Sequence, residues 1–401
     1  MTFNIPASLT TPATLLMQGG ARHLIADELR RRRLRRPLFV SDATMESLGL
    51  LDDVRGPLDE GSFDTDRVLV ADRHEPTDES IAPVIEALRD HDADALIALG
   101  GGSVIDSAKA AALLYAHGGA IRDFRFPAAI PPGGVPVFAV PTTAGTGSEA
   151  TAATVITDVA SGEKLLLMGP NLVPEVAIVD YTLSMSQPRR LTADTGLDAL
   201  THAIESYVSR KATSDTRAVA AQAMGAIFGS LKRAYEDGDD EDARREMMHG
   251  ATLAGIAFSN ASVALVHGMS RPIGARFHVP HGLSNAMLLP AVTAFSLGDA
   301  PSAYGNCARI MGLADEGLSD QEAGRVLAEA LQALTEDLEV PSLEAFGIER
   351  EEFLSCVADM AAQALASGSP ANNPRQASDG EIADLYRAVY DRAPLRDILA
   401  L

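Results

Sequence analysis

Short apolar runs rich in branched side chains recur through the first half of the chain and predict buried β-strands. They lie at residues 38–40, 68–70, 95–99, 135–140 and 176–179. Between them, residues 80–89 and 103–114 follow the period of an α-helix. Strands that alternate with helices are typical of a parallel sheet with helices on its faces. We therefore expect an α/β architecture of the nucleotide-binding type.

After about Pro188 the pattern changes, because strand-like runs disappear and alanine-rich, helix-favouring segments continue to Leu401. Candidate helices lie at residues 194–209, 214–235, 242–257, 320–336 and 379–392. The sequence therefore predicts two domains, an α/β domain at 1–187 and an all-helical domain at 188–401.

Composition narrows the class of protein. The chain has 401 residues, of which 46% are hydrophobic and 22% charged, as in soluble globular proteins. Its 33 basic and 55 acidic residues give a net charge of -22, which argues against a nucleic acid or an anionic membrane as partner. The sequence shows neither a signal peptide nor an apolar stretch long enough to span a membrane. Its two cysteines, Cys307 and Cys356, form no close pair, so we expect a reduced, cytoplasmic protein.

Four residues in two compact motifs have the spacing of a divalent-metal site. Asp198 and His202 are four residues apart, which places both side chains on one face of a helix. His267 and His281 bound a segment long enough for a helix and a return turn. Three imidazoles and one carboxylate suit Fe(II), with Zn(II) as the alternative, and leave a position open for substrate. A capping aspartate and scattered histidines would explain each residue taken alone, but the four together favour the metal.

Two polar turns that follow predicted strands are candidates for coenzyme binding. Gly100, Gly101, Gly102 and Ser103 precede a helix whose N-terminus can bind a pyrophosphate, and Ser103 with Asp106 can cap that helix. An ordinary tight turn would use the same glycines, since the full dinucleotide fingerprint is absent. The second turn, at 141–149, offers hydroxyl groups at the carboxyl end of a strand, where α/β sheets bind ligands, although a plain loop uses the same residues.

Asp42 bears on the choice of coenzyme. It follows the strand predicted at 38–40. A carboxylate in that place could hold the ribose hydroxyls and repel a 2′-phosphate. The sequence therefore favours NAD over NADP.

Together these motifs resemble those of the iron-containing, or group III, alcohol dehydrogenases. The similarity runs over nearly the whole chain, through residues 100–103, 141–149, 195–205 and 267–282. It implies an N-terminal Rossmann-like dinucleotide-binding domain and a C-terminal helical metal-binding domain, a fold of the dehydroquinate synthase-like type. The implied reaction is hydride transfer between NAD(H) and an alcohol, aldehyde or ketone at the metal. The family also leads us to expect a homodimer or higher homo-oligomer, paired through a strand near the amino terminus.

The resemblance assigns roles to individual positions of this sequence. Metal ligands are implied at Asp198, His202, His267 and His281, and a pyrophosphate loop at residues 100–103. Phe258 is implied at the wall of the substrate pocket, although a position in the core would also suit it. Contacts to the nicotinamide and its ribose are implied at Thr142, Thr143, Thr146, Ser148 and Lys164.

Arg271 departs from the family pattern. Many members carry a histidine there, four residues after the ligand at His267, and that histidine is often linked to proton transfer. A guanidinium stays charged and cannot act as that acid or base. Proton release could instead use His278 with the coenzyme ribose and water, or Arg271 could bind a substrate carboxylate. A structural arginine paired with an acid is the third explanation.

Other functions stay open at this point. A carboxylate-bearing substrate, as in the related maleylacetate reductases or hydroxyacid-oxoacid transhydrogenases, would use Arg271 as its anchor. A nucleotide-binding protein without catalysis is disfavoured, because the four metal ligands are intact. A lyase of the dehydroquinate synthase kind is disfavoured, because the histidine motifs match it poorly. The substrate itself, the native metal and the physiological direction are not determined by the sequence.

Overall fold

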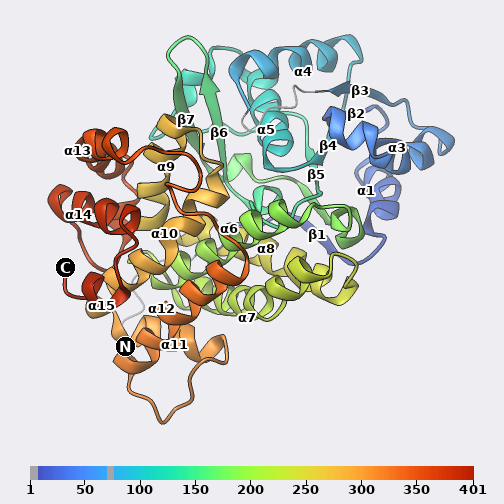
Figure 1. Ribbon diagram of the computed structural model, residues 1–401. Coiled ribbons are helices and arrows are strands. Elements are labelled where there is room, and N and C mark those ends of the chain that lie inside the picture. Colours follow the sequence, from blue (N-terminus) through green and yellow to red (C-terminus); the bar gives the residue numbers. More distant parts are fainter. Residues whose placement is uncertain (1–7, 70–75) are drawn as a thin grey trace. The chain divides into compact units, whose positions relative to one another are not determined.

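A computed structural model describes residues 8–69 and 76–401 (Figure 1). By its internal contacts the chain divides after Gln187 into an α/β unit, from Thr10 to Gln187, and a helical unit from Pro188 to Leu401. Within the described residues, the α/β unit holds a six-stranded sheet in the order β1-β8-β5-β4-β2-β3. All of its neighbouring strands are parallel. The α/β fold predicted from the alternation of strands and helices is confirmed.

The strands and helices of the α/β unit follow one another along the chain. The strands of the sheet are β1 (Thr14–Met17), β2 (Pro37–Ser41), β3 (Asp66–Leu69), β4 (Ala95–Gly100), β5 (Val137–Pro141) and β8 (Val176–Val179). The helices are α1 (Ile25–Arg32), α2 (Ala43–Ser47), α3 (Leu50–Glu60), α4 (Asp78–Asp90) and α5 (Gly102–His117). An antiparallel hairpin is formed by β6 (Ala153–Asp158) and β7 (Glu163–Met168).

The five strands predicted from apolar runs are present, with ends shifted by at most two residues. Val70, the last residue of the run predicted at 68–70, lies outside the described residues. The strands β1, β6 and β7 are not among the predicted ones. In β6 exposed and buried side chains alternate, with Val155 39% exposed and Ile156 fully buried. A search for continuous apolar runs passes over such a half-buried strand.

Helices cover both faces of the sheet, because successive side chains of a strand point to opposite faces. Leu38 and Val40 of β2 pack in a core with α4 and α5. Phe39, the residue between them, packs in a second core with α1 and α3. Side chains buried on both faces explain why the strands read as continuous apolar runs rather than as alternating ones.

From Arg189 onward, every regular element that the structure describes is helical, as predicted. The helices predicted from the sequence correspond to α6, α7, α8, α12 and α14. In chain order the helices are α6 (Arg189–Val208), α7 (Ser214–Glu236), α8 (Glu241–Ala261), α9 (Leu265–Phe277), α10 (His281–Ser296), α11 (Pro301–Ile310), α12 (Asp320–Asp337), α13 (Arg350–Ala366), α14 (Asp379–Tyr390) and α15 (Leu395–Ile398).

Helix α6 is the central element of the helical unit. It packs against α7, α8 and α10, and Figure 1 shows it among them. Its side chains are buried on nearly every face from Thr192 to Val208. A helix in such a position is expected to be apolar all round, yet α6 buries Asp198, His202 and Glu205. Ionisable side chains are rarely buried in a core unless they are paired or bind a ligand. The three buried ionisable residues of α6 therefore indicate a candidate functional site on this helix.

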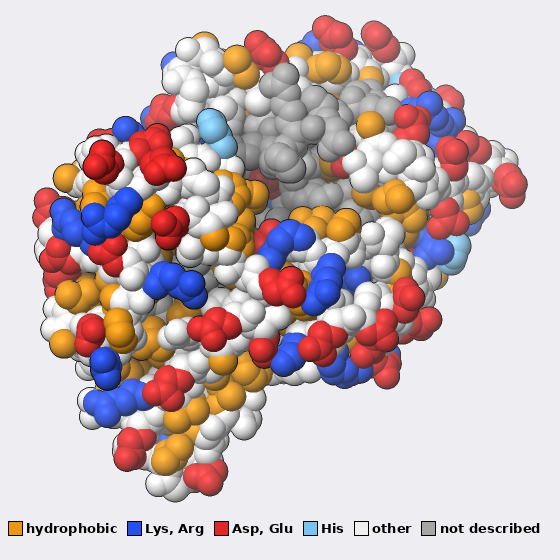
Figure 2. Space-filling view, viewed as in Figure 1, with side chains coloured by type: hydrophobic (Ala, Val, Ile, Leu, Met, Phe, Trp, Pro, Cys, Tyr) orange, Lys and Arg blue, Asp and Glu red, His pale blue; other side chains and the backbone are white. Residues whose placement is uncertain are grey.

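Figure 2 shows acidic side chains scattered over the visible face, with Lys and Arg side chains between them. In the part of the chain that the structure describes, no single helix has the length and apolarity to cross a membrane. The pair α8 and α9, bent by 102°, meets those two criteria only when taken together.

Candidate functional site

Three helices of the helical unit bring the four predicted metal ligands together. Asp198 and His202 lie one turn apart on α6, His267 lies in the first turn of α9, and His281 begins α10. One ligand atom from each side chain lies within 4.8 Å of the other three. From Oδ1 of Asp198, the distance to Nε2 is 3.9 Å for His202, 3.6 Å for His267 and 3.8 Å for His281. We call these four residues the metal cluster.

The metal cluster fits a divalent ion. Bonds of about 2.1 Å in tetrahedral geometry separate ligand atoms by roughly 3.4 Å, close to the spacing of this cluster. The side chains of Asp198, His202 and His267 are only 4% to 6% exposed, whereas that of His281 is 46% exposed. The cluster is therefore held in the core and accessible on the side of His281. Imidazole and carboxylate ligands suit iron or zinc.

Burial and opposite charges set the electrostatics of the metal cluster. Burial would raise the pKa of Asp198, but the neighbouring histidines outweigh it and hold that pKa far below its usual value. Burial would lower the pKa of His267, but the charge of Glu205, with hydrogen bonds to Asp198 and Glu205, raises it to about 9. Both shifts show that the carboxylates of this core favour positive charge beside them, as a cation site requires.

Glu205 is a member of the site that was not predicted. Its buried carboxylate accepts hydrogen bonds from the backbone nitrogens of Ala264, at 2.9 Å, and Val266, at 2.6 Å, which lie at the start of α9. It also lies 2.6 Å from Nδ1 of His267. Glu205 thus caps the helix that carries His267 and turns Nε2 of that histidine toward Asp198. The signal was available, because Glu205 follows Asp198 and His202 on the same face of a helix.

Asn285, one turn after His281 on α10, was also not predicted. Its side chain is fully buried, and Nδ2 donates to Oδ1 of Asp198 at 2.7 Å. The same nitrogen lies 3.1 Å from Nε2 of His267 and 3.3 Å from Nε2 of His281. Asn285 therefore contacts three of the four ligands. Its bond to Asp198 orients the carboxylate, which is the usual task of a residue behind a metal ligand.

A close helix contact accounts for the glycine after His281. A Cβ atom on Gly282 would lie 2.4 Å from the carbonyl oxygen of Asp194 and 3.3 Å from Cβ of Asp198. Any side chain at this position would push α10 away from α6. His281 and Asp198 approach each other because residue 282 is a glycine.

Of the other residues predicted for the helical unit, Phe258 contacts the metal cluster and His278 does not belong to it. The ring of Phe258 stacks on that of His202, with centroids 4.1 Å apart, so Phe258 lies against the metal cluster. His278 is exposed, has a φ of 55° and ends α9 as its C-cap, and it is not part of the ligand group. Arg271 lies one turn after His267 on α9 and is half-buried. The structural ion pair considered for Arg271 is absent among the described residues.

In the α/β unit, the two polar turns lie side by side. Gly100 and Pro141 are partners in the register of β4 and β5, and the backbone nitrogen of Thr142 donates to the carbonyl of Gly100 at 3.1 Å. A Cβ atom on Gly102 would lie 2.8 Å from Cγ2 of Thr146. The glycine turn thus packs its backbone directly on the threonine side chains. Both turns follow the carboxyl ends of strands, where α/β sheets bind ligands.

Asp42 lies at the edge of the glycine turn. Its Oδ2 is 3.4 Å from the position that a Cβ atom on Gly100 would occupy. Its Oδ1 accepts from the backbone nitrogen of Met45 at 2.9 Å and so caps α2. The structure therefore brings together Asp42 and the two turns predicted to bind coenzyme.

The predicted cap of α5 is wrong. The N-cap residue is Gly101, and no side chain caps the helix, so neither Ser103 nor Asp106 does so. Asp106 instead accepts hydrogen bonds from Oγ of Ser148 and from the backbone nitrogen of Val155, and joins α5 to the hairpin. An N-terminus without a side-chain cap offers its first N–H groups to an anion.

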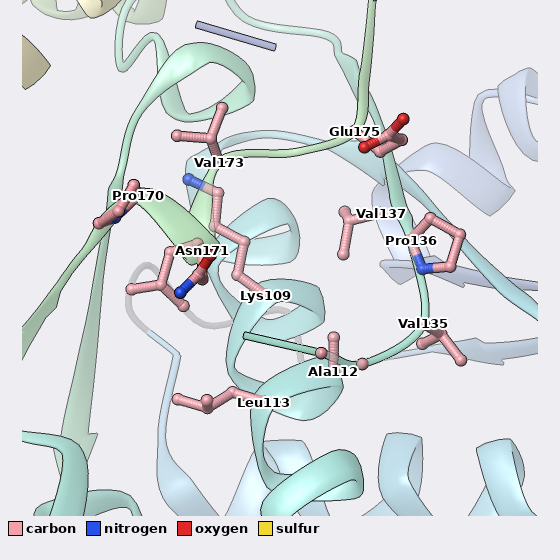
Figure 3. A pocket seen from close by; sticks show the side chains of 13 residues that line it. Lys109, Ala112, Leu113, Val135, Pro136, Val137, Pro170, Asn171, Val173 and Glu175 are labelled. Carbon is pink, nitrogen blue, oxygen red and sulfur yellow. The ribbon is translucent and has the colours of Figure 1, made fainter. Parts of the chain in front are cut away.

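Lys164, predicted as a coenzyme contact, lies on β7 opposite Thr157 and outside the two turns. Figure 3 shows a pocket in the same unit, lined by Lys109 and by the segments that lead into β5 and β8. Its volume is about 310 Å³. Its lining residues Val137 and Glu175 lie at the amino ends of β5 and β8, whereas the two turns follow the carboxyl ends of strands. Nζ of Lys109 donates to Ser148, Thr151 and Ala153, and burial lowers its pKa to about 8. Its amino group is thus saturated by the fold and is not offered to a ligand.

Comparisons with known proteins cover both units. A model of the iron-containing alcohol dehydrogenases matches residues 12–181, and the C-terminal model of the Fe-containing alcohol dehydrogenase family matches residues 192–390. The chain is 34% identical over 376 residues to the NAD-dependent methanol dehydrogenase of Bacillus methanolicus, covering 94% of this chain and 97% of that protein. It is 35% identical over 357 residues to the NADPH-dependent butanol dehydrogenase of Clostridium saccharobutylicum, covering 88% of this chain and 91% of that protein. The crystal structure of a 1,3-propanediol oxidoreductase has a TM-score of 0.91 at 30% identity, covering 95% of this chain and 99% of that one.

Proposed function

This chain belongs to the iron-containing alcohol dehydrogenase family, and from that premise we propose that it is a metal-dependent dehydrogenase acting on alcohols and aldehydes with NAD(H). The observation that carries the proposal is the metal cluster, in which three buried ligands and the half-exposed His281 face one another. Fe(II) is the proposed ion, with Zn(II) as the alternative. Catalytic metal sites keep one position open for substrate, and the exposed side of His281 would provide that position here.

The residues of the helical unit have separable tasks in this reaction. When bound, the divalent ion supplies Lewis-acid polarisation of the substrate oxygen, and the nicotinamide coenzyme accepts or donates the hydride. Asp198, His202, His267 and His281 would hold the ion. Glu205 keeps the proton of His267 on Nδ1, so that Nε2 is a ligand atom. Phe258, stacked on His202, would form an apolar wall for the substrate and exclude water from the reacting atoms.

We propose NAD rather than NADP as the preferred coenzyme. The relatives of this chain include one enzyme named as NAD-dependent and one named as NADPH-dependent, so family membership does not decide between the two coenzymes. The support is Asp42, whose carboxylate lies against Gly100 at the end of β4. A negative charge there would attract ribose hydroxyls and repel a 2′-phosphate. Gly100, Gly101, Gly102 and Ser103 are the proposed pyrophosphate contacts, with Thr142, Thr143, Thr146 and Ser148 on the neighbouring turn.

The assembly and location of the protein are further parts of the proposal. Among the strands that the structure describes, β1 lies at an edge of the sheet, and edge strands readily pair with a second copy of a chain. We therefore propose a homodimer that pairs through the region of β1. A cytoplasmic location rests on Cys307 and Cys356, which are buried free thiols.

The decisive experiment is a metal-reconstitution assay. Chelator-treated protein is assayed anaerobically with NAD or NADP and a panel of short alcohols and diols, with and without added Fe(II) or Zn(II). We expect turnover only after metal is added, and faster turnover with NAD. His202→Ala should lower activity by at least about 100-fold, because loss of a Lewis acid removes several kcal/mol of stabilisation. His249→Ala, which changes an exposed histidine of α8, is the matched control.

Two results would count against the proposal. Turnover that is the same before and after metal removal would exclude the metal cluster from the reaction. Protein that binds metal and NAD but converts no alcohol or diol in the panel would contradict an enzyme of simple alcohols and would direct the search to hydroxy acids and Arg271.

A further inference from the structure

One arginine of the helical unit differs from the others that are not solvent-exposed. Arg271 makes no hydrogen bond and no ion pair within the described part of the chain. Each of the others bonds through its guanidinium to a carboxylate, a hydroxyl or a carbonyl group; these are Arg190, Arg244, Arg309 and Arg375. A half-buried charge without a partner is unfavourable, so its presence requires an explanation.

The nearby carboxylates do not supply the missing partner. Oδ1 of Asp198 faces the histidines of the metal cluster. The carboxylate of Glu205 is occupied by two backbone nitrogens and by His267. Burial lowers the pKa of Arg271 and only the charge of Glu205 opposes this effect, yet no ion pair forms between them. The guanidinium still keeps its proton, so it is a permanent cation.

Arg271 is placed close to where the substrate is expected. It follows His267 by one helical turn, which puts the two Cβ atoms about 5–6 Å apart on one face of α9. None of its nitrogens is among the buried polar atoms that lack a partner, so the guanidinium reaches solvent. The metal cluster is itself accessible beside His281. A small molecule can therefore contact both.

The charge of the site also favours an anion. A divalent ion, two carboxylates and one guanidinium leave a single positive charge, which one further anionic group would balance. A carboxylate is the group whose two oxygens match the planar fork of a guanidinium.

We propose that Arg271 and the metal cluster form a two-point site for hydroxy acids and their oxo-acid products. The carboxylate binds Arg271 while the alcohol or carbonyl oxygen occupies the open side of the metal cluster. The short distance between the two points favours a chain of about three to five carbon atoms. This inference rests on the proposed dehydrogenase function and names the substrate class of the same site.

The test compares two substrates that differ only in the terminal anion. Metal-loaded protein is assayed with butan-1-ol and with 4-hydroxybutanoate, and binding of 4-hydroxybutanoate and NAD is measured separately by calorimetry. The variants are Arg271→Met, which keeps length without charge, and Arg271→Lys, which keeps charge without the fork. Arg276→Met, on an exposed residue of the same helix, is the matched control.

We expect Arg271→Met to raise KM and Kd for 4-hydroxybutanoate by about 10- to 100-fold, the worth of charge-assisted hydrogen bonds. KM for butan-1-ol and Kd for NAD should stay within about twofold, and Arg271→Lys should lie between the two proteins. An equal rise in KM for butan-1-ol and for 4-hydroxybutanoate would overturn the inference. Weaker binding of NAD alone, with KM unchanged for both substrates, would also overturn the inference, because the anion bound by Arg271 would then be a coenzyme phosphate.

Failure of the inference and failure of the proposed function give different results. If butan-1-ol is oxidised and Arg271→Met leaves 4-hydroxybutanoate unaffected, the inference is wrong and the dehydrogenase function stands. If neither substrate is oxidised, the dehydrogenase function is wrong. Calorimetry with 4-hydroxybutanoate then still decides whether Arg271 binds a carboxylate.

Discussion

The two units of this protein build their sites from different parts of the chain. In the α/β unit, the two turns proposed to bind coenzyme consist of backbone packed closely on threonine side chains, with Gly102 against Thr146. In the helical unit, the metal cluster consists of ionisable side chains that are buried and supported by Glu205 and Asn285. The first site leaves no room for a side chain at Gly102, and the second loses a buried hydrogen-bond partner if Glu205 or Asn285 is changed. Steric changes should therefore damage the former, and changes of charge or hydrogen bonding the latter.

The largest effect is expected where a buried partner of the metal cluster is changed. Glu205→Gln keeps the shape but replaces one of the two acceptor oxygens by an amide nitrogen, which donates and cannot accept from His267 or from the backbone of α9. Partners of this kind contribute 10- to 100-fold to metal affinity. We expect metal affinity, measured by competition with a chelator, to fall by about that factor while Kd for NAD is unchanged. Glu336→Gln, at an exposed position of α12, is the control.

If Glu205→Gln instead weakened NAD and metal binding equally, the two sites would not be separable in the way their construction suggests. Unchanged metal affinity would show that Glu205 serves only as the cap of α9.

A smaller effect is expected from adding one methyl group to the glycine turn. In Gly102→Ala the new Cβ would lie 2.8 Å from Cγ2 of Thr146, so the turn must shift. We expect Kd for NAD, measured by fluorescence, to rise about tenfold, an effect typical of overpacking by one methyl group. Metal affinity should not change. The double variant Gly102→Ala with Thr146→Ala should recover most of the loss; a double variant no better than the single one would argue against the steric explanation.

The smallest effect concerns a buried charge of the α/β unit that we assign to the fold alone. Burial lowers the pKa of Lys109 from its ordinary 10.5 to about 8. Between these values the unfolded chain binds the proton and the folded chain does not, so the free energy of unfolding should rise with pH. The expected slope is about 1 kcal/mol per pH unit relative to Lys109→Met, measured by urea unfolding. Parallel profiles for the two proteins would show that Lys109 titrates normally, and a changed kcat would give it a role in the reaction.

Much of the candidate site could be predicted because its motifs are local. Asp198 and His202 share a helix face, and the glycines at 100–102 adjoin a strand and a helix. Their spacing in the sequence was therefore enough to predict them as candidates. Glu205 and Asn285 lie on the same faces, but their contacts are with residues far along the chain. The capping of α5 by Ser103 and Asp106 was wrong, because Asp106 is drawn to Ser148 and Val155 of the following segments. A long-range hydrogen bond displaced the local one.

By itself the sequence determined the α/β and helical halves, the four candidate metal ligands and the family, because these depend on periodicity and on short motifs. Only the tertiary structure decided which side chains support those ligands, that Phe258 lies on His202, and that Arg271 is half-buried without a partner within the described chain. Such facts depend on which helices meet. Gly282 allows α10 to reach α6, and Glu205 joins α6 to α9. No local pattern encodes contacts between segments that meet only in the folded chain.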